Sequence, residues 1–405
     1  MISVEDAQKK ALLGISTLGA ELVSVDEALG RVLAEDLIAT VPVPRFTNSA
    51  MDGYALHSRS TAQASAAEPV RLDVIGESAA GDDGEMVVTR KEAARIFTGA
   101  PLPKGCDAVV MQENVTRDGH YVLISEPVGT GANVRHTGED VAEGTTLLRR
   151  GTIIGAGDIA VAATQGRVSL SVTRRPRVAI LPTGNELVEI DTLLTSPATK
   201  VGNGNALMLA AQVREAGGVP LRLPIVGDSP EAIGKALEEA AAVADLVLTS
   251  GGVSVGEHDY VKSVLAERGK VTFHKVAMRP GKPLAVGSIG ATPFFGLPGN
   301  PVSSFVSFEL FVRPALRAMQ GARDIERVKL TATLTAKAPR ATDRRNYVRV
   351  RIVRDSDKLL ATPSARQGSA DLTSLAEVDG LALIEPGSTP AAAHDQVSCL
   401  LLRTV

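Results

Sequence analysis

The chain has 405 residues, 44% of them hydrophobic and 22% charged, with a formal net charge of −3. This length exceeds what one hydrophobic core serves, so several domains are expected. The charge lacks the basic footprint of a nucleic-acid-binding protein, and no apolar run reaches the ~18 residues of a membrane span. The polar start, MISVEDAQKK, is unlike a secretion signal, and Cys106 and Cys399 match no zinc spacing. We therefore expect a cytoplasmic protein that uses neither nucleic acid nor a membrane as partner.

The first 173 residues are expected to mix helices with short strands. Apolar residues at helical spacing predict helices over 4–18 and 23–37. Turn residues then punctuate a β-rich stretch, in which Asp52 precedes a strand that begins at Tyr54. Asp52 is either a turn-forming residue or a carboxylate that the turn presents to a cleft.

From residue 174 onward, strands and helices alternate. Strands are predicted at 178–181, 219–226, 246–248, 271–276, 284–287 and 293–296, and helices at 203–216, 229–244, 261–268 and 301–319. Repeated β-α-β units predict a doubly wound parallel sheet, in which ligands bind at the carboxyl ends of the strands.

One of these strands breaks into a glycine- and serine-rich loop, TSGGVSVGEHD, before the next helix. Backbone N–H groups at such a junction form an anion site, and the glycines let the backbone approach the ligand closely. The alternative is an ordinary strand-to-helix turn. The candidate residues of this loop are Ser250, Gly251, Gly252, Ser254 and Gly256, with Asp259 as a carboxylate that can hold a cation.

Further polar residues follow other strand ends of the same domain. Acidic groups favour a divalent metal, and basic groups favour an anionic ligand. A second turn, Pro298, Gly299, Asn300 and Pro301, opens the last helix of the domain and offers another anion site. We interpret the ensemble as a crevice for a ligand with two phosphate-like groups, and interdomain salt bridges are the alternative. The acids are Glu186, Asp228 and Asp259, and the bases are Lys275, Arg279 and Lys282.

After residue 323 the hydrophobic period becomes two, which predicts a small separate β domain. Arg349 and Ser369 lie in this domain and are expected to face a neighbouring site.

Seven motifs, in this order along nearly the whole chain, carry a resemblance to a known family. The chain resembles the MoeA family, the molybdopterin molybdenumtransferases, which also includes the E domain of gephyrin. The motifs are SAMDGYA (49–55), TGAP (98–101), GED (138–140), PTGNEL (182–187), TSGGVSVGEHD (249–259), RPGKP (279–283) and GLPGNPVS (296–303).

The resemblance implies an enzyme that binds adenylated molybdopterin, breaks its pyrophosphate bond, releases AMP and joins molybdate to the dithiolene. It implies Mg²⁺ as cofactor, with Glu186, Asp228 and Asp259 as its ligands, and molybdate as substrate. It also implies a homodimer with an active site shared between subunits, and the pathway's molybdopterin adenylyltransferase as a partner. A molybdopterin-binding scaffold and a tungstate-using paralogue remain as alternatives.

Matching the motifs residue by residue transfers the family's functional positions to this sequence. Arg349 and Ser369 match positions that the family uses near molybdate. The chain departs from the family at Arg279, where many members have lysine. The segment TSPATKVGNGNALM replaces the family's usual Asp-Ser-Asn-Ser run, so the contact that the family makes at Asn205 is left open. The positions transferred by motif are Asp52, Thr98, Asp140, Glu186, Asp228, Asp259, Lys275, Pro298 and Pro301.

The expected fold class is a multidomain α/β and β protein. A doubly wound molybdopterin-binding domain would comprise 1–24 and 174–322, and a small α/β linking domain 25–42 and 141–173. An inserted β domain would comprise 43–140, and a β-barrel-like domain 323–405.

Overall fold

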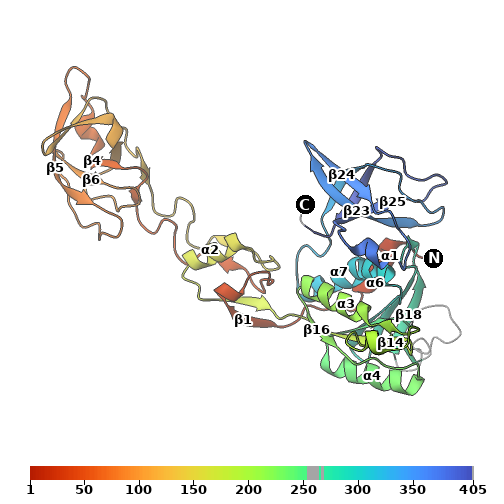
Figure 1. Ribbon diagram of the computed structural model, residues 1–405. Helices are drawn as coiled ribbons and strands as arrows, with labels where there is room; N and C mark the ends of the chain where they lie inside the picture. The colour runs from red at the N-terminus through yellow and green to blue at the C-terminus, as the bar shows by residue number, and fades with distance from the viewer. Residues whose placement is uncertain (253–263, 266–268, 404–405) are drawn as a thin grey trace. The chain divides into compact units, whose positions relative to one another are not determined.

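The computed structural model describes residues 1–252, 264–265 and 269–403. These residues form two compact units, which are described separately (Figure 1). The first unit comprises 1–35, 150–159 and 168–405, and the second comprises 36–149 and 160–167. Most of the predicted inserted domain falls within the second unit, and the finer division into four domains stays a prediction. No helix among the described residues is long and apolar enough to cross a membrane.

The second unit is built on a six-stranded sheet with the order β7-β4-β6-β5-β9-β8. Tyr54, Leu72 and Val122 lie in its core, so the strand predicted after the Asp52 turn is confirmed. Short pairs β2–β11 and β3–β10 accompany this sheet. The strands are β2 (Leu37–Ile38), β3 (Asn48–Ser49), β4 (Gly53–Leu56), β5 (Val70–Ser78), β6 (Glu92–Ile96), β7 (Ala108–Met111), β8 (Val115–Asp118), β9 (Tyr121–Ile124), β10 (Val134–Arg135) and β11 (Thr146–Leu148).

The first unit contains the predicted doubly wound sheet, with the order β16-β13-β17-β21-β20-β18. The first four strands are parallel, as predicted, whereas β20 and β18 pair antiparallel. A tight turn at Gly290 joins β20 to β21, and only antiparallel neighbours accept so short a connection. The strands are β13 (Arg177–Pro182), β16 (Val219–Arg222), β17 (Leu246–Ser250), β18 (Gly269–Lys275), β20 (Pro283–Ile289) and β21 (Thr292–Leu297).

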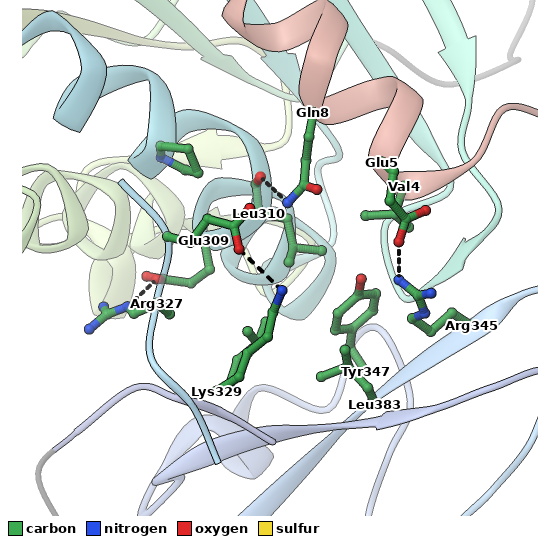
Figure 2. Close-up of a pocket in the computed structure, with 13 residues that line it drawn as sticks. Val4, Glu5, Gln8, Glu309, Leu310, Arg327, Lys329, Arg345, Tyr347 and Leu383 are labelled. Atoms are coloured by element: carbon green, nitrogen blue, oxygen red, sulfur yellow. Dashed lines mark hydrogen bonds and ion pairs between the residues drawn. The ribbon is translucent and has the colours of Figure 1, made fainter. Parts of the chain in front are cut away.

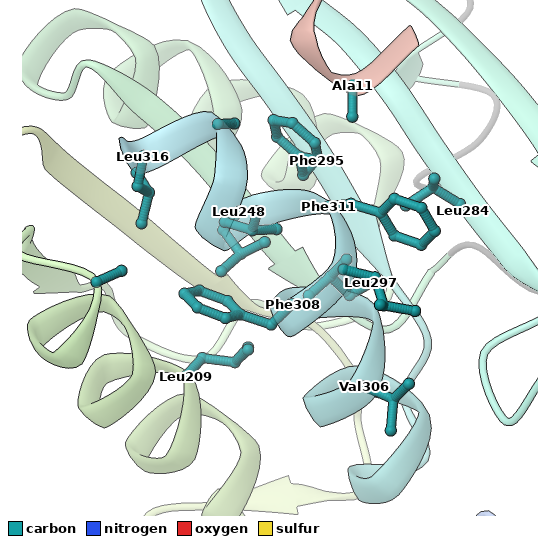
Figure 3. Close-up of a cluster of buried hydrophobic side chains, with 14 of the residues drawn as sticks. Ala11, Leu209, Leu248, Leu284, Phe295, Leu297, Val306, Phe308, Phe311 and Leu316 are labelled. Carbon is teal, nitrogen blue, oxygen red and sulfur yellow. The ribbon is translucent and has the colours of Figure 1, made fainter. Parts of the chain in front are cut away.

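Helices cover both faces of this sheet (Figure 1). Helix α4 packs on one face through Ile233 and Leu237. It begins with a cap in which Ser229 Oγ accepts the Ala232 N–H, as the Ser-Pro-Glu start predicts. On the other face, one cluster joins strand residues to a π-helical turn carrying Phe308 and Phe311 (Figure 3). The helices are α1 (Val4–Leu12), α2 (Ala156–Thr164), α3 (Gly204–Glu215), α4 (Pro230–Val243), α6 (Pro301–Ser307) and α7 (Arg313–Met319), with the π-helical turn at Phe308–Val312.

The carboxyl-terminal strands close into a five-stranded barrel, because β23 pairs with both β24 and β25. Between β18 and β20 the chain leaves the first sheet, and its short strand β19 (Met278–Arg279) pairs with β23 of the barrel. Sheet and barrel also share one hydrophobic cluster, to which the barrel contributes Tyr347 and Leu381. The barrel strands are β22 (Lys329–Leu334), β23 (Arg345–Asp355), β24 (Lys358–Pro363), β25 (Gly380–Ile384) and β26 (Gln396–Leu401).

Charged pairs border a cavity of about 130 Å³ between α1, the π-helical turn and the barrel (Figure 2). Arg345 lies 2.6 Å from Glu5 of α1, and Arg327 lies 2.9 Å from the buried Glu309. Glu309 also accepts a hydrogen bond from Gln212 at 2.8 Å. Two donors offset the desolvation penalty of the buried Glu309 carboxylate, so these contacts hold the barrel against the helices.

The prediction of a helix over 23–37 is wrong. This stretch contains the end of β1 (Ala20–Ser24), a 3₁₀ turn (Val25–Glu27) and β2. β1 pairs antiparallel with β12 (Ser169–Thr173), so a partner far along the sequence overrides the local helical spacing. The first helix, α1, is confirmed but ends at Leu12. Most of the helix predicted at 261–268 lies outside the described residues.

Gly53 offers a test of the packing in the second unit. A Cβ atom there would overlap the carbonyl oxygen of Val110 on the adjacent strand β7. We expect Gly53→Ala to lower the free energy of unfolding by about 1–3 kcal/mol, measured by denaturant titration. Gly129→Ala is the matched control, because no atom lies within 4 Å of the added carbon. Equal stability of the two variants would show that β4 and β7 do not pack this closely.

Candidate active site at the carboxyl edge of the sheet

Backbone pairing aligns the strand ends at which the sequence predicts a ligand site. Pro182 of β13 lies opposite Ser250 of β17, which lies opposite Leu297 of β21. On the antiparallel side, Lys275 at the end of β18 lies opposite Pro283 at the start of β20. Because β18 is antiparallel to β20 and β20 is antiparallel to β21, β18 runs in the same direction as β21. Lys275, at the end of β18, therefore lies at the same edge of the sheet as the ends of the parallel strands. The prediction that these chain segments meet at one edge is confirmed for the described residues.

Two glycine-containing loops adjoin at this edge. The Gly251 N–H donates to the Leu297 carbonyl at 3.0 Å, and a Cβ on Gly299 would lie 3.7 Å from the Gly251 Cα. Gly251 and Gly252 have φ angles of 105° and 68°, which favour glycine. The loops therefore expose backbone that a phosphate group can approach closely.

Asn205 at the start of α3 ties the two loops together. Its Nδ2 donates to Ser250 Oγ at 2.9 Å and to the Gly299 carbonyl at 2.7 Å. Because Ser250 Oγ accepts this bond, its own proton remains available for an oxygen of a ligand. The sequence left this contact open, since the segment before α3 departs from the family's usual run. The asparagine beside a helix start was the available signal.

The acidic side of the edge is built around Asn185. The Asn185 N–H donates to Asp228 Oδ2 at 3.0 Å, and the Asp228 N–H donates back to Asn185 Oδ1 at 3.2 Å. Glu186 folds its carboxylate over Gly184, where a side chain would overlap it. Among the described residues no three acidic, histidine or cysteine side chains gather as a metal site. The predicted third carboxylate, Asp259, lies outside the described residues, as do Ser254 and Gly256.

The basic side consists of Lys275, Arg279 and Lys282, which are all exposed. None of them forms an ion pair with another described residue. The Val276 N–H donates to the Lys282 carbonyl at 2.8 Å and closes the turn that carries this lysine. These cations, held on a closed turn, create a positive potential at the edge of the sheet.

Pro298 to Pro301 form the turn before α6, which meets the barrel through Ser369. Asn300 Nδ2 donates to Ser369 Oγ at 3.3 Å, and the Val302 N–H donates to the Ser369 carbonyl at 3.3 Å. Ser369 therefore contacts the turn before α6, and its place beside molybdate stays a prediction.

Arg349 is fully buried in the barrel. Its Nη2 donates to the carbonyls of Arg366 and Gly368, both at 3.2 Å, whereas Nε and Nη1 have no hydrogen-bond partner within the described part of the chain. Burial lowers the pKa of Arg349 to about 10, so it remains charged at neutral pH. A buried cation with unsatisfied donors is an energetic cost that an anion would relieve.

A neighbouring cavity of about 260 Å³ connects Arg279 with the barrel. Its lining includes Gly368, whose carbonyl accepts from Arg349, and polar Gln367 and Asn346. Arg279 reaches it because β19 pairs with β23, opposite Asn346.

Asp52, Thr98 and Asp140 belong to the second compact unit. Asp52 Oδ1 accepts from both the backbone N–H and the hydroxyl of Thr98, each at 2.8 Å. These hydrogen bonds lower the pKa of Asp52, so it is a carboxylate at neutral pH. Asp140 is exposed, and its N–H donates to the Val43 carbonyl at 3.0 Å. The structure thus joins two of these three predicted residues directly.

Comparison with known proteins covers almost the entire chain. Residues 2–166 match the "MoeA N-terminal region (domain I and II)", 179–318 a "Probable molybdopterin binding domain", and 331–402 the "MoeA C-terminal region (domain IV)". A molybdopterin molybdenumtransferase of Bacillus subtilis is 37% identical over 388 residues, covering 95% of this chain and 90% of that protein. The chain belongs to the MoeA family of molybdopterin molybdenumtransferases.

Further relatives support the assignment of this chain to the MoeA family. Molybdopterin molybdenumtransferase 2 of Mycobacterium tuberculosis is 39% identical over 355 residues, which are 86% of this chain and 87% of that protein. The crystal structure of a molybdopterin biosynthesis MoeA protein from Pyrococcus horikoshii matches with a TM-score of 0.85 and 32% identity, covering 100% of both chains. The predicted family and fold class are therefore confirmed.

Asn205 provides a test of how this MoeA-family edge is held together. Replacing it with alanine removes both bonds to the loops, each worth ~1 kcal/mol. We expect Asn205→Ala to speed amide hydrogen exchange roughly tenfold at Gly251, whose N–H donates to the Leu297 carbonyl. Asn114→Ala, at an exposed position of the second unit, should leave the exchange of the Gly251 amide unchanged. Unchanged exchange in the Asn205 variant would show that the loops hold each other without it.

Proposed function

We propose that this transferase of the MoeA family joins molybdate to adenylated molybdopterin and releases AMP. The observation that carries the proposal is the aligned edge of the sheet, where two glycine loops adjoin and Lys275, Arg279 and Lys282 lie without ion pairs among the described residues. Such an edge suits a ligand with two phosphate groups and a second, oxyanionic reactant.

The pyrophosphate is proposed to lie against the glycine loops. Backbone N–H groups of Gly252, Gly299 and Asn300 and the Ser250 hydroxyl would donate to its oxygens. Pro298 and Pro301 fix the second loop, because proline restricts the backbone on both sides of the turn. Preorganised donors of this kind stabilise charge that develops on the leaving AMP without reorganising during the reaction. Ser254 and Gly256 are proposed to extend the same donor set.

The acids suit a divalent cation. Asp228 accepts one backbone bond through Oδ2 and keeps Oδ1 for a ligand, and the Glu186 carboxylate lies at the same side of the edge. Two or three carboxylates together with phosphate oxygens form a donor set that Mg²⁺ prefers. We propose that Glu186, Asp228 and Asp259 hold Mg²⁺, which when bound offsets the negative charge of the pyrophosphate.

Molybdate is proposed to bind between the basic edge and the barrel. Lys275 and Lys282 attract the dianion, and Arg279 places a charge in the cavity beside Gly368. The unpartnered Nε and Nη1 groups of Arg349, behind the same loop, add a buried positive charge. Ser369 lies next to Gly368 and supplies a hydroxyl. This arrangement holds molybdate near the pterin, so catalysis rests on positioning and electrostatics.

Asp52, Thr98 and Asp140 are proposed to serve the same reaction. The Asp52 carboxylate, kept ionised by Thr98, can accept a proton or a hydrogen bond from water or substrate. We place the reaction in the cytoplasm, where the thiols of Cys106 and Cys399 stay reduced, as they are in the structure. The pathway's molybdopterin adenylyltransferase is the proposed source of the substrate.

Lys282→Ala separates the two ligands of this reaction. We expect it to raise the molybdate concentration for half-maximal AMP release roughly tenfold, because one charge of an exposed cluster is lost. Binding of adenylated molybdopterin should change much less. AMP release measured against molybdate, and pterin binding by fluorescence, give the two values.

Lys358→Ala on β24 is the control, because this exposed lysine lies on the barrel away from the turn. An equal loss for both ligands would move Lys282 to the phosphate site. AMP release with tungstate but not molybdate would favour the tungstate-using alternative. Binding of the pterin without any oxyanion-dependent AMP release would favour the scaffold.

We also propose that the protein is a homodimer. The ribbon of β1 and β12 exposes large apolar side chains, since Leu22 is 75% and Val168 84% exposed. Leu29, which follows β1, is 60% exposed. A two-stranded ribbon buries little surface by itself, and an apolar patch on it suits a partner subunit.

The charge variant Leu22→Asp tests this surface. We expect it to shift the protein toward the monomer by at least about tenfold in the dissociation constant, because a charge replaces apolar area at the contact. Light scattering over a concentration series measures this shift. Val353→Asp, at an exposed apolar position of the barrel, is the matched control. A wild-type protein that stays monomeric at all concentrations would refute the proposal.

A further inference from the structure

An open groove of about 370 Å³ lies on the antiparallel side of the sheet, beside α1. It runs along the face of β18 and β20 and ends at the Gly290 turn. Among the residues that the structure describes, no acidic residue lines it, and its cationic groups come from two separate elements. The lining consists of Lys10, Leu13, Gly14, Lys270, Thr272, His274, Val286, Gly287, Ser288, Gly290, Ala291 and Pro293.

Strand geometry explains why the polar groups gather there. Lys270, Thr272 and His274 alternate along β18, so their side chains share one face. Ser288 of β20 lies directly opposite Lys270. Lys10 comes from the last turn of α1. The groove thus presents two lysines, a histidine and two hydroxyls to one space.

Simpler explanations cover only part of this cluster. A lysine in the last turn of a helix interacts favourably with the helix dipole, which accounts for Lys10. A lysine on an edge strand discourages pairing with other chains, which accounts for Lys270. Neither accounts for a half-buried histidine facing these lysines. Burial and the nearby Lys10 lower the pKa of His274, so the site as it stands disfavours a third positive charge.

An anion bound in the groove would favour the protonated form of His274. Neither Lys10 nor Lys270 forms an ion pair with another residue in the described part of the chain. The volume exceeds what a bare oxyanion fills and lies within the range of small-molecule sites. Leu13, Val286 and Pro293 add apolar surface beside the charges.

We propose that this groove binds an organic phosphomonoester, with the phosphate held by Lys10, Lys270 and the Ser288 hydroxyl. The organic part lies against Leu13, Val286 and Pro293. This site is distinct from the strand-end crevice, because it occupies the face of β18 and β20 rather than the edge that carries Lys275. The proposal does not depend on the proposed reaction.

The site has a pH dependence with a defined sign. The charged groups facing His274 are Lys10 from α1 and Lys270 from its own strand, and neither β20 nor β21 carries a titratable residue. A bound dianion favours protonated His274, so the complex takes up a proton. The affinity for the dianionic form of the ligand therefore rises as the pH falls through the pKa of His274.

The experiment uses the full-length protein and ribose 5-phosphate as probe. Imidazole NMR signals are followed during titration, and His274→Gln assigns the His274 signal. We expect a saturable shift of this signal and a higher His274 pKa in the complex. The double variant Lys10→Ala/Lys270→Ala should weaken binding at least about tenfold, because two charge-assisted contacts are lost.

Lys235→Ala is the matched control, since this exposed lysine lies on α4, on the opposite face of the sheet. It should leave the affinity unchanged, whereas equal weakening would reduce the effect to net charge and overturn the proposal. An unmoved His274 signal at saturating probe, or binding that survives the double variant, would also overturn it. Inorganic phosphate that binds as tightly as ribose 5-phosphate would overturn the assignment of the organic part.

Discussion

The candidate site depends on the hydrogen-bonded register of β13, β17 and β21. Pro182, Ser250 and Leu297 are neighbours because the backbone pairs them, although more than a hundred residues separate the first from the last. A shift of one residue in any of these strands would turn its side chains to the other face and separate the two glycine loops. The buried, continuous apolar character of β17 and β21 protects this register, since both faces of the sheet are covered.

The second constraint is the excursion of the chain between β18 and β20. β19 adds a strand to the barrel and then returns, so Arg279 is fixed to β23 while Lys275 and Lys282 remain at the sheet. The buried Arg349 also lies on β23, three residues beyond Asn346, which pairs with Arg279. The barrel and the sheet edge are therefore connected by continuous backbone through β19.

Much of this arrangement was predictable because it depends on residues that are close together in the sequence. Ser229-Pro230 begins a helix, and glycines follow a buried strand. The helix predicted over 23–37 failed because its apolar spacing is compatible with a strand, and only β12, far along the chain, decides between them. The contact of Asn205 was left open for a related reason, since its partners Ser250 and Gly299 are brought close only by the fold. The burial of Arg349 is likewise a property of the closed barrel and not of its flanking residues.

The shared cluster beneath the barrel has a consequence for synthesis. It contains Val4 and Ala7 from the first helix together with Leu402 near the other end of the chain. At ~5–20 residues per second, the ribosome needs roughly 20–80 seconds to connect them. During that interval the second compact unit, whose residues end at 167, is already complete. The apolar face of α1 meanwhile lacks its partners from the barrel, so the nascent chain exposes apolar surface that the finished protein buries.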